Sequence, residues 1–181
     1  MVQVTAGARL HFGFGNLSLA RERLYGGVGV ALDEPRVVVE ADPAEGVHCE
    51  DALAAEYVRR AVDCLDLPGA SVSVVERLPR HVGLGSGTQL ALATLSAVAR
   101  AHDHGVDVRE HAPHLGRGGR SGVGVAAFET GGFIVDGGHP TELFTAAPPA
   151  EGDWTVPPVT ACHDVPADWR FVLVTPDAEA G

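Results

Sequence analysis

Apolar and polar residues alternate along several stretches of the chain, which is the pattern of strands with one buried face. Residues 2–14 read VQVTAGARLHFGF and predict one or two strands. Residues 26–41 predict two more strands, with a turn at Glu34-Pro35 between them. Residues 71–78 and the glycine-flanked residues 131–138 predict one strand each.

Other stretches carry apolar residues at a spacing of three and four, as the buried face of a helix requires. Residues 51–65 fit this spacing, with Asp51 as the N-cap. A second helix follows a glycine-rich loop and runs to about Ala101. Two short helices are predicted at 107–116, where Pro113 interrupts the pattern, and at 121–129. The region 140–168 is predicted to be irregular, and WRFVLVTP at 169–176 predicts a strand.

Composition and charge narrow the possible partners. All 13 basic residues are arginine, and the 24 acidic residues give a formal net charge of −11, which argues against a nucleic-acid partner. No apolar stretch approaches the roughly 18–20 residues that a membrane helix needs. Because the N-terminus lacks the basic-then-apolar pattern of a signal peptide, we expect a cytoplasmic protein. The three cysteines, far apart in sequence, favour neither a disulfide framework nor a zinc site.

The loop HVGLGSGT at residues 81–88 holds three glycines in five positions. A Walker A loop needs a lysine, which this chain lacks. A dinucleotide fingerprint needs GxGxxG directly after a strand, whereas here the glycines alternate and Pro79 intervenes. The remaining class is a Gly/Ser loop at a helix N-terminus, whose free N–H groups and positive dipole end attract phosphate. The alternative is a plain glycine-rich turn in which Ser86 or Thr88 caps the helix.

The surrounding residues resemble a known superfamily. PRHVGLGSGTQLALA resembles the phosphate-loop motif of the GHMP kinases at Pro79 and at Gly83-Leu84-Gly85-Ser86. Many of these kinases carry a second motif, Ser-Gly-Val-Asp, seven residues before a Gly-Gly pair, and its Asp takes the proton of the accepting hydroxyl. Here Ser121-Gly122-Val123 is followed by Gly124, which has no carboxylate and cannot act as the base. The resemblance implies an α+β fold: a GHMP kinase-like N-terminal domain, in two layers, with a mixed sheet and helices.

One branch of the superfamily matches this departure. ARLHFGF, GGVGVALDEP, the loop and above all residues 116–139 resemble β-ribofuranosylaminobenzene 5′-phosphate synthase, a family of archaeal methanopterin biosynthesis. The resemblance implies a glycosyltransferase that condenses 5-phosphoribosyl 1-pyrophosphate with 4-aminobenzoate or 4-hydroxybenzoate and releases carbon dioxide and pyrophosphate. Two other interpretations stay open: an ATP-dependent small-molecule kinase, and a non-catalytic fragment or binding module.

The resemblance and the residue types together give a candidate site. The pyrophosphate is expected on the loop backbone, with Ser86 touching a magnesium ion. Arg117 and Arg120 suit a 5′-phosphate or a carboxylate, unless they only solvate a loop. The predicted phosphate-binding residues are Gly83, Leu84, Gly85, Ser86, Gly87 and Thr88. The predicted substrate-binding residues are Arg9, His11, Arg117, Arg120, Ser121, Asp136 and His139.

Several of these residues have an equally good structural interpretation. Arg9 and His11 lie on an early strand, where the superfamily contacts substrate, but packing at the edge of the core explains them nearly as well. Asp136 and His139 could orient magnesium or ribose hydroxyls, whereas an aspartate that caps a turn is an equal alternative for Asp136. No catalytic residue is predicted.

The expected domain organisation follows from the length of the chain. Superfamily members run to roughly twice the domain size seen here. Residues 1–165 are therefore expected to form the N-terminal substrate- and phosphate-binding domain, and residues 166–181 a stub of a second α/β domain that is largely absent. The expected partners are small-molecule substrates and Mg²⁺, with no nucleic acid and no membrane, and a homodimer is left open.

Overall fold

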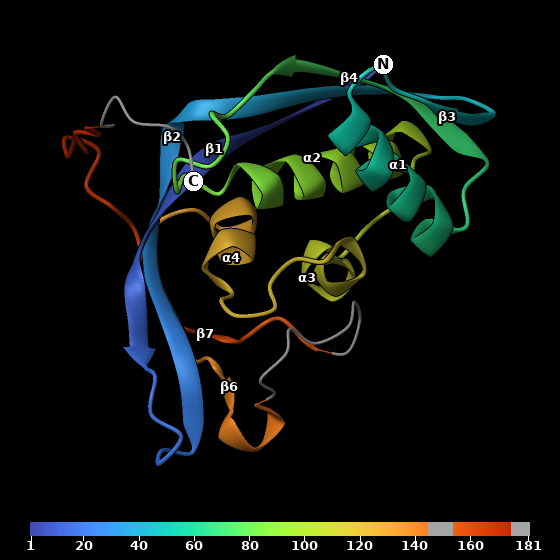
Figure 1. Ribbon diagram of the computed structural model, residues 1–181. Helices are drawn as coiled ribbons and strands as arrows, with labels where there is room; N and C mark the ends of the chain where they lie inside the picture. Colours follow the sequence, from blue (N-terminus) through green and yellow to red (C-terminus); the bar gives the residue numbers. More distant parts are fainter. Residues whose placement is uncertain (145–153, 175–181) are drawn as a thin grey trace.

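The computed structural model describes residues 1–144 and 154–174, and in these ranges it has one mixed sheet of seven strands with helices on one face (Figure 1). The order β3-β4-β2-β5-β7 places β2 at the centre, and β1 and β6 also pair with β2. Only the β3–β4 pair is parallel among these strands. The strands are β1 (Val2–Asn16), β2 (Arg23–Pro43), β3 (Gly46–His48), β4 (Gly69–Glu76), β5 (Phe133–Asp136), β6 (His139–Pro140) and β7 (Val159–His163).

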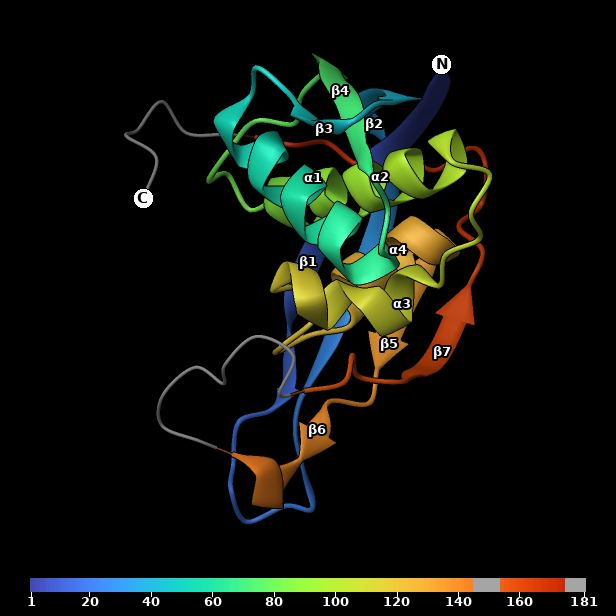
Figure 2. The same ribbon diagram turned by 90° about the vertical axis from the view of Figure 1, so that its right-hand side faces the viewer.

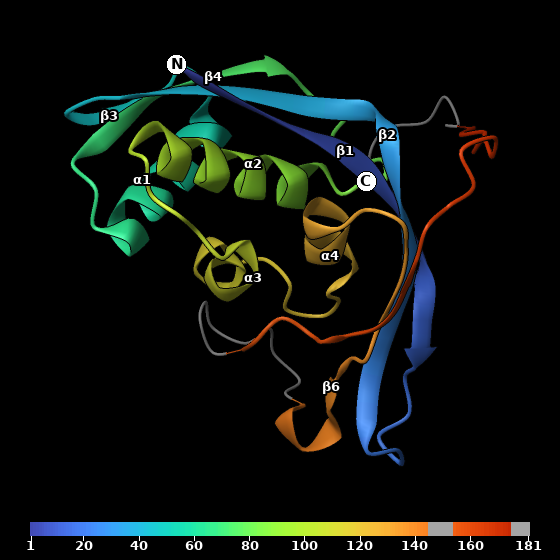
Figure 3. The ribbon, with the colours of Figure 1, turned by 180° about the vertical axis from the view of Figure 1, so that it is seen from behind.

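The long strand β2 bends where a turn was predicted. β2 runs for 21 residues without reversing, so the predicted turn at Glu34-Pro35 is wrong. β1 stays paired on both sides: Gly7 lies opposite Arg36 and Arg9 opposite Ala31, so four residues of β2 face one residue of β1. Extra residues on one strand bend it and strengthen its twist, and proline is tolerated there because no ladder hydrogen bond is lost. Both strands pass this bend together (Figures 1 and 3).

The helices cover the inner face of the bent sheet. Asp51 caps the first helix as predicted, since its side chain accepts a hydrogen bond of 2.6 Å from the Ala54 backbone N–H. The second helix is buried along 11 consecutive residues, from Gln89 to Ala99, because the sheet lies on one side of it and the first helix packs against another (Figure 2). The helices are α1 (Ala52–Leu65), α2 (Ser86–Ala101), α3 (Val108–His111), the 3₁₀ turn η1 (Ala112–Leu115), α4 (Val123–Glu129) and the 3₁₀ turn η2 (Thr141–Leu143).

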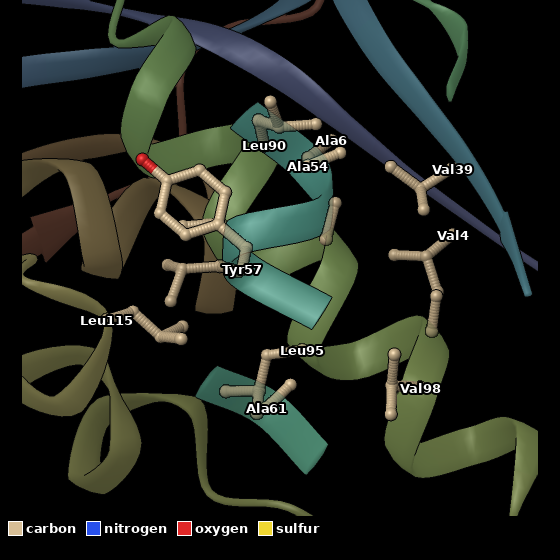
Figure 4. Packing of buried hydrophobic residues seen from close by; sticks show 14 of the residues in the cluster. Val4, Ala6, Val39, Ala54, Tyr57, Ala61, Leu90, Leu95, Val98 and Leu115 are labelled. Carbon is tan, nitrogen blue, oxygen red and sulfur yellow. The ribbon is translucent and has the colours of Figure 1, made fainter. Parts of the chain in front are cut away.

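One main hydrophobic core joins the sheet to α1 and α2. Val4 and Val39 contribute from the sheet, Leu95 and Val98 from α2, and Tyr57 from α1 (Figure 4). The core side of α1 follows the helical spacing read from the sequence, with Ala54, Tyr57, Val58, Ala61 and Leu65 all buried. α2 packs against both β1 and β2, so this core holds the helix in place on the sheet.

The predictions for the last third of the chain are confirmed in part. The region 140–168 was expected to be irregular, and residues 154–158 and 164–168 are, but η2 is a 3₁₀ turn and β7 pairs antiparallel with β5 at an edge of the sheet. The predicted strand at 169–176 is absent over 169–174, where none of the described strands pairs with these residues, and residues 175–176 lie outside the described ranges. No helix in the described part of the chain is long and apolar enough to cross a membrane. The predicted α+β class is confirmed.

Candidate functional site

The glycine loop opens directly into α2, as the sequence predicted. Gly85 is the N-cap residue and adopts φ 77°, a left-handed conformation that glycine accepts without a steric cost. The N–H groups of Thr88 and Gln89 bond to the Gly85 carbonyl, whereas those of Ser86 and Gly87 have no backbone acceptor within the described residues. No side chain caps this helix, so the predicted alternative of capping by Ser86 or Thr88 is not what the structure has. The first turn of α2 therefore presents free N–H donors.

Arg9 ties β1 to this loop. Its backbone N–H donates to the Leu84 carbonyl at 3.1 Å, and its Nη1 donates to the Gly83 carbonyl at 2.7 Å. Its side chain lies against Gly85, where an added Cβ would come within 3.0 Å of the Arg9 Cγ. The Leu84 side chain belongs to the hydrophobic core, so the loop is held by the burial of Leu84 and by the hydrogen bonds of Arg9. These contacts bring a predicted substrate residue, Arg9, to the predicted phosphate loop.

Arg117 also contacts the first turn of α2. A Cβ on Gly87 would lie 3.1 Å from both terminal nitrogens of the Arg117 guanidinium, so the glycine makes room for that side chain. The guanidinium carbon of Arg117 lies 5.2 Å from the centre of the Tyr57 ring, and its Nη2 donates to the Tyr57 hydroxyl. The Trp154 indole N–H donates to the Arg117 carbonyl at 3.2 Å. Sequence reasoning missed Tyr57, because a buried aromatic on the core face of a helix gives no sign of a polar role.

A second group of predicted residues meets beside this loop. Ser121 Oγ donates to Asp136 Oδ2 at 2.8 Å, and His11 Nε2 lies 3.2 Å from the same Ser121 oxygen. The backbone N–H of Gly122 also donates to Asp136 Oδ2, at 2.8 Å. All three side chains lie over Gly27 of β2, where an added Cβ would be 2.3 Å from Ser121 Oγ and 2.9 Å from His11 Nε2. Gly27 is a second residue that sequence reasoning did not single out.

Asp136 has the structural role that was its alternative interpretation. Its side chain is buried, with 2% of its surface exposed, and its Oδ1 accepts a hydrogen bond of 2.9 Å from the Gly138 N–H two residues ahead. This is a turn capped by an aspartate. With both oxygens engaged by N–H and O–H donors, Asp136 is held as an acceptor inside the protein. The expected role of Asp136 toward magnesium or ribose hydroxyls stays a prediction.

The two remaining predicted residues lie differently. His139 is half-buried near Asp136 and Arg23, and its Nε2 is buried without a hydrogen-bond partner in the described residues. Arg120 is exposed and makes no hydrogen bond or ion pair within the described part of the chain. The structure therefore brings Arg117, but not Arg120, to the glycine loop, and the roles of Arg120 and His139 in substrate binding stay predictions.

Burial makes the basic groups of this site less basic. Burial lowers the pKa of the Arg9 guanidinium. Burial is also the main reason that the pKa of His11 is below its usual value, and the positive charge of Arg9 adds to this effect while Asp136 opposes it. Burial lowers the pKa of His139, against a hydrogen bond with the backbone of Gly119 and the charge of Asp136. Both histidines are therefore harder to protonate than a free imidazole.

Gly124, at the position of the kinase aspartate in the sequence resemblance, lies next to the loop helix. A Cβ there would be 3.2 Å from the Thr88 Cγ2 atom, and the Gly124 carbonyl accepts a hydrogen bond of 2.8 Å from Gln89 Nε2. The start of α4 thus packs on the start of α2 without any carboxylate between them. Among the described residues, no group of three or more His, Cys, Asp or Glu side chains could hold a metal ion.

Comparison with known proteins finds similarity to GHMP kinases and to phosphate synthases. Residues 49–132 match the model of the GHMP kinases N terminal domain. The chain is 40% identical over 187 residues to the β-ribofuranosylphenol 5′-phosphate synthase of Methanothermobacter thermautotrophicus, and 37% identical over 190 residues to that of Archaeoglobus fulgidus. The chain is a relative of these synthases. The alignments cover 95% and 98% of this chain and 57% and 58% of the two relatives, so the chain spans less than two thirds of their length.

Kinases of the superfamily are also similar, but more distantly. The chain is 30% identical to the homoserine kinase of Methanopyrus kandleri, over 82% of this chain and 49% of the kinase. The mevalonate kinase of Methanococcus jannaschii superposes with a TM-score of 0.57 at 12% identity, covering 74% of this chain and 52% of the kinase. The phosphomevalonate kinase of Streptococcus pneumoniae gives 0.59 at 13% identity, covering 78% and 49%. These likenesses confirm the predicted GHMP kinase-like fold of this chain.

Proposed function

We propose that the chain binds 5-phosphoribosyl 1-pyrophosphate and belongs to an enzyme that transfers the phosphoribosyl group to a 4-substituted benzoate, with loss of carbon dioxide and pyrophosphate. The names of the two synthases describe a ribofuranosyl phenol as product. A phenol results when 4-hydroxybenzoate loses its carboxylate, so of the two predicted acceptors 4-hydroxybenzoate is favoured. Methanopterin biosynthesis, a cytoplasmic location and a homodimer belong to the same proposal.

The observation that carries the proposal is the pair of arginines seated on the glycine loop. Arg9 lies against Gly85 and Arg117 against Gly87, at a helix N-terminus with free N–H groups, in a chain whose net charge is −11. Guanidinium groups and helix N-termini both bind phosphate oxygens well. A ligand with several phosphate charges fits this local excess of positive charge, which contrasts with the acidic rest of the chain.

The proposed reaction needs electrostatic stabilisation more than a strong base at the carbon centres. Pyrophosphate leaves C1 of the ribose, positive charge develops on the sugar, and the ring carbon that bears the carboxylate attacks. Donors fixed on the leaving pyrophosphate stabilise its charge without reorganisation. Magnesium would arrive with the pyrophosphate and neutralise part of that charge, and at the loop the protein offers it the Ser86 hydroxyl rather than a carboxylate cluster.

Product analysis tests the proposal. The chain is incubated with phosphoribosyl pyrophosphate, Mg²⁺ and either 4-hydroxybenzoate or 4-aminobenzoate, and mass spectrometry follows the ribosyl arene while an enzymatic assay follows pyrophosphate. We expect equal amounts of both products with one arene. Arene and phosphoribosyl pyrophosphate that stay unchanged, while the chain consumes ATP with a hydroxyl acceptor, would support the kinase instead.

The kinase remains the second candidate because of the homoserine kinase relative and the kinase-like fold. Gly124 weighs against it, since no carboxylate stands where a base would act. The third possibility, a binding module without catalysis, predicts tight binding of phosphoribosyl pyrophosphate with no turnover.

A further inference from the structure

Three side chains form a hydrogen-bonded row from the buried end of β5 to the half-buried His11 of β1. Asp136 accepts from Ser121 at 2.8 Å, and Ser121 Oγ lies 3.2 Å from His11 Nε2. Arg9 and His11 are two residues apart on one strand, in a stretch where the pairing of β1 with β2 is regular. They therefore point to the same face, about 7 Å apart along the strand. The row ends next to the arginine that holds the phosphate loop.

The hydrogen bonds assign the protons in this row. Asp136 Oδ2 also accepts from the Gly122 N–H, so it acts as an acceptor and the Ser121 hydroxyl proton is directed at it. The Ser121 oxygen then has lone pairs left, one of which accepts from the Val123 N–H at 3.2 Å. His11 must donate to the other, because Ser121 has no second proton to give. In a neutral imidazole a proton on Nε2 leaves Nδ1 as an acceptor.

We propose that Asp136 and Ser121 are positioning residues that hold His11 as the Nε2-protonated tautomer, so that its Nδ1 accepts the proton of the 4-hydroxyl group of the arene. This inference rests on the proposed function for the identity of the arene. His11 Nδ1 makes no hydrogen bond within the described residues, and it is not a fully buried atom. It is therefore open to a ligand.

The proton transfer balances the proposed reaction. The O–H bond of the 4-hydroxyl breaks and the proton moves to Nδ1, while the oxygen electron pair enters the ring. The ring carbon para to that oxygen, which bears the carboxylate, forms the bond to C1 of the ribose as the C1–O bond to pyrophosphate breaks. The bond to the carboxylate then breaks, carbon dioxide leaves, and its electron pair restores the aromatic phenolate. The His11 imidazolium returns its proton to the phenolate oxygen.

The charges around His11 favour a neutral base. Arg9, on the same strand, is the positive group that faces it, and Asp136, at the end of β5, is the negative one. Ser121 and the Phe14 ring, whose centre is 5.0 Å from that of His11, complete the surroundings. The Asp136 charge reaches His11 through the Ser121 hydroxyl and fixes the tautomer, while burial and Arg9 keep the ring unprotonated until the substrate supplies a proton.

Long-range ¹H–¹⁵N NMR of the ¹⁵N-labelled chain at pH 8 tests the tautomer, because it distinguishes protonated from unprotonated ring nitrogens. The His11 signals are assigned from a His11→Gln variant, with His163→Gln, an exposed histidine of β7, as the matched control. We expect a protonated Nε2 and an unprotonated Nδ1 in the parent chain. Protonation on Nδ1 in the parent would overturn the proposal whatever any variant does.

Variants of Ser121 test the positioning role. Ser121→Ala removes the acceptor of the Nε2 proton and should convert His11 to a mixture of tautomers, whereas Ser121→Thr keeps a hydroxyl and should keep the parent pattern. Ser73→Ala, at an exposed position of β4, is the matched control and should change nothing. An unchanged tautomer in a folded Ser121→Ala chain would refute the role of Ser121.

Ligand titration separates this inference from the proposed function. With phosphoribosyl pyrophosphate present, 4-hydroxybenzoate should shift the His11 Nδ1 resonance and benzoate, which lacks the hydroxyl, should not. Equal shifts, or none with either arene, would overturn the assignment of Nδ1. A hydroxyl-dependent shift without any ribosyl product would instead count against the transferase while supporting the His11 arrangement. Where product forms, His11→Gln should lower kcat by about 10²–10⁴.

Discussion

Alanine substitutions at the three loop glycines should separate the effect of backbone strain from the effect of the contacts with Arg9 and Arg117. At Gly83 (φ 80°) an added Cβ meets no atom within 4 Å, so the substitution costs only left-handed strain, about 1–2 kcal/mol of folding stability. At Gly85 (φ 77°) the same strain is joined by a 3.0 Å contact with Arg9. Gly83→Ala is thus the matched control for Gly85→Ala.

Gly87 isolates the arginine effect. It is helical and free of left-handed strain, so Gly87→Ala should stabilise α2 by up to about 1 kcal/mol. The new Cβ would lie 3.1 Å from the Arg117 guanidinium, which is too close, so the guanidinium would have to move slightly. A charge-assisted hydrogen bond contributes about 1.5–3 kcal/mol, so partial loss should weaken phosphoribosyl pyrophosphate binding on the order of tenfold.

Two measurements on the same samples check this. Urea denaturation should rank Gly87→Ala at or above the parent chain and Gly85→Ala below Gly83→Ala. Isothermal titration should show weaker binding in Gly87→Ala despite its stability, so unfolding cannot explain the loss. Parent-like affinity in Gly87→Ala would refute the idea that the missing side chain at Gly87 lets Arg117 take its place at the phosphate site.

Three further predictions follow from single contacts. Arg117→Ala should weaken phosphoribosyl pyrophosphate binding about tenfold to a hundredfold by calorimetry, and more than Arg120→Ala does, because only Arg117 lies on the loop; the reverse order would contradict the site. The folded-state pKa of His11 is lowered, so the unfolded chain binds more protons below about pH 6.5 and stability should fall as the pH falls through that value; equal losses between pH 7.5 and 5.5 in the parent and in His11→Gln would refute this. Asp51→Ala should cost about 1 kcal/mol in urea denaturation through loss of the α1 cap, and an unchanged midpoint would argue that the cap contributes nothing.

The sequence predicted the helices well and the sheet less well, for physical reasons that can be named. α1 carries its Asp51 cap and its apolar face in its own residues, and α2 is a long apolar run after a glycine loop, so local reasoning located both. The bend in β2 depends on β1 remaining paired across Pro35, and a proline read locally suggests a turn. β7 is short and largely exposed and depends on its pairing with β5, whereas the apolar residues 169–174 pair with none of the strands in the described part of the chain.

The candidate site shows the same division. The glycine loop and Arg117 were found from residue types and spacing, because backbone freedom and positive charge are local properties, whereas Arg9 was singled out through the superfamily resemblance. The roles of Tyr57 and Gly27 come from residues distant in sequence that meet only in the fold, and neither residue type signals a site by itself. For Asp136, turn capping and binding of magnesium or ribose were equal alternatives, because the three donors that its buried carboxylate accepts from cannot be read from the sequence.

Release of labelled carbon dioxide distinguishes a phosphoribosyl transferase from a kinase. The chain is supplied with 4-hydroxybenzoate labelled at the carboxyl carbon, Mg²⁺, and either phosphoribosyl pyrophosphate or ATP. We expect labelled carbon dioxide with phosphoribosyl pyrophosphate, none with ATP, and a large loss of the signal in Arg117→Ala. Binding of ATP in preference to phosphoribosyl pyrophosphate, with ADP formed from a hydroxyl acceptor and no carbon dioxide released, would contradict the transferase.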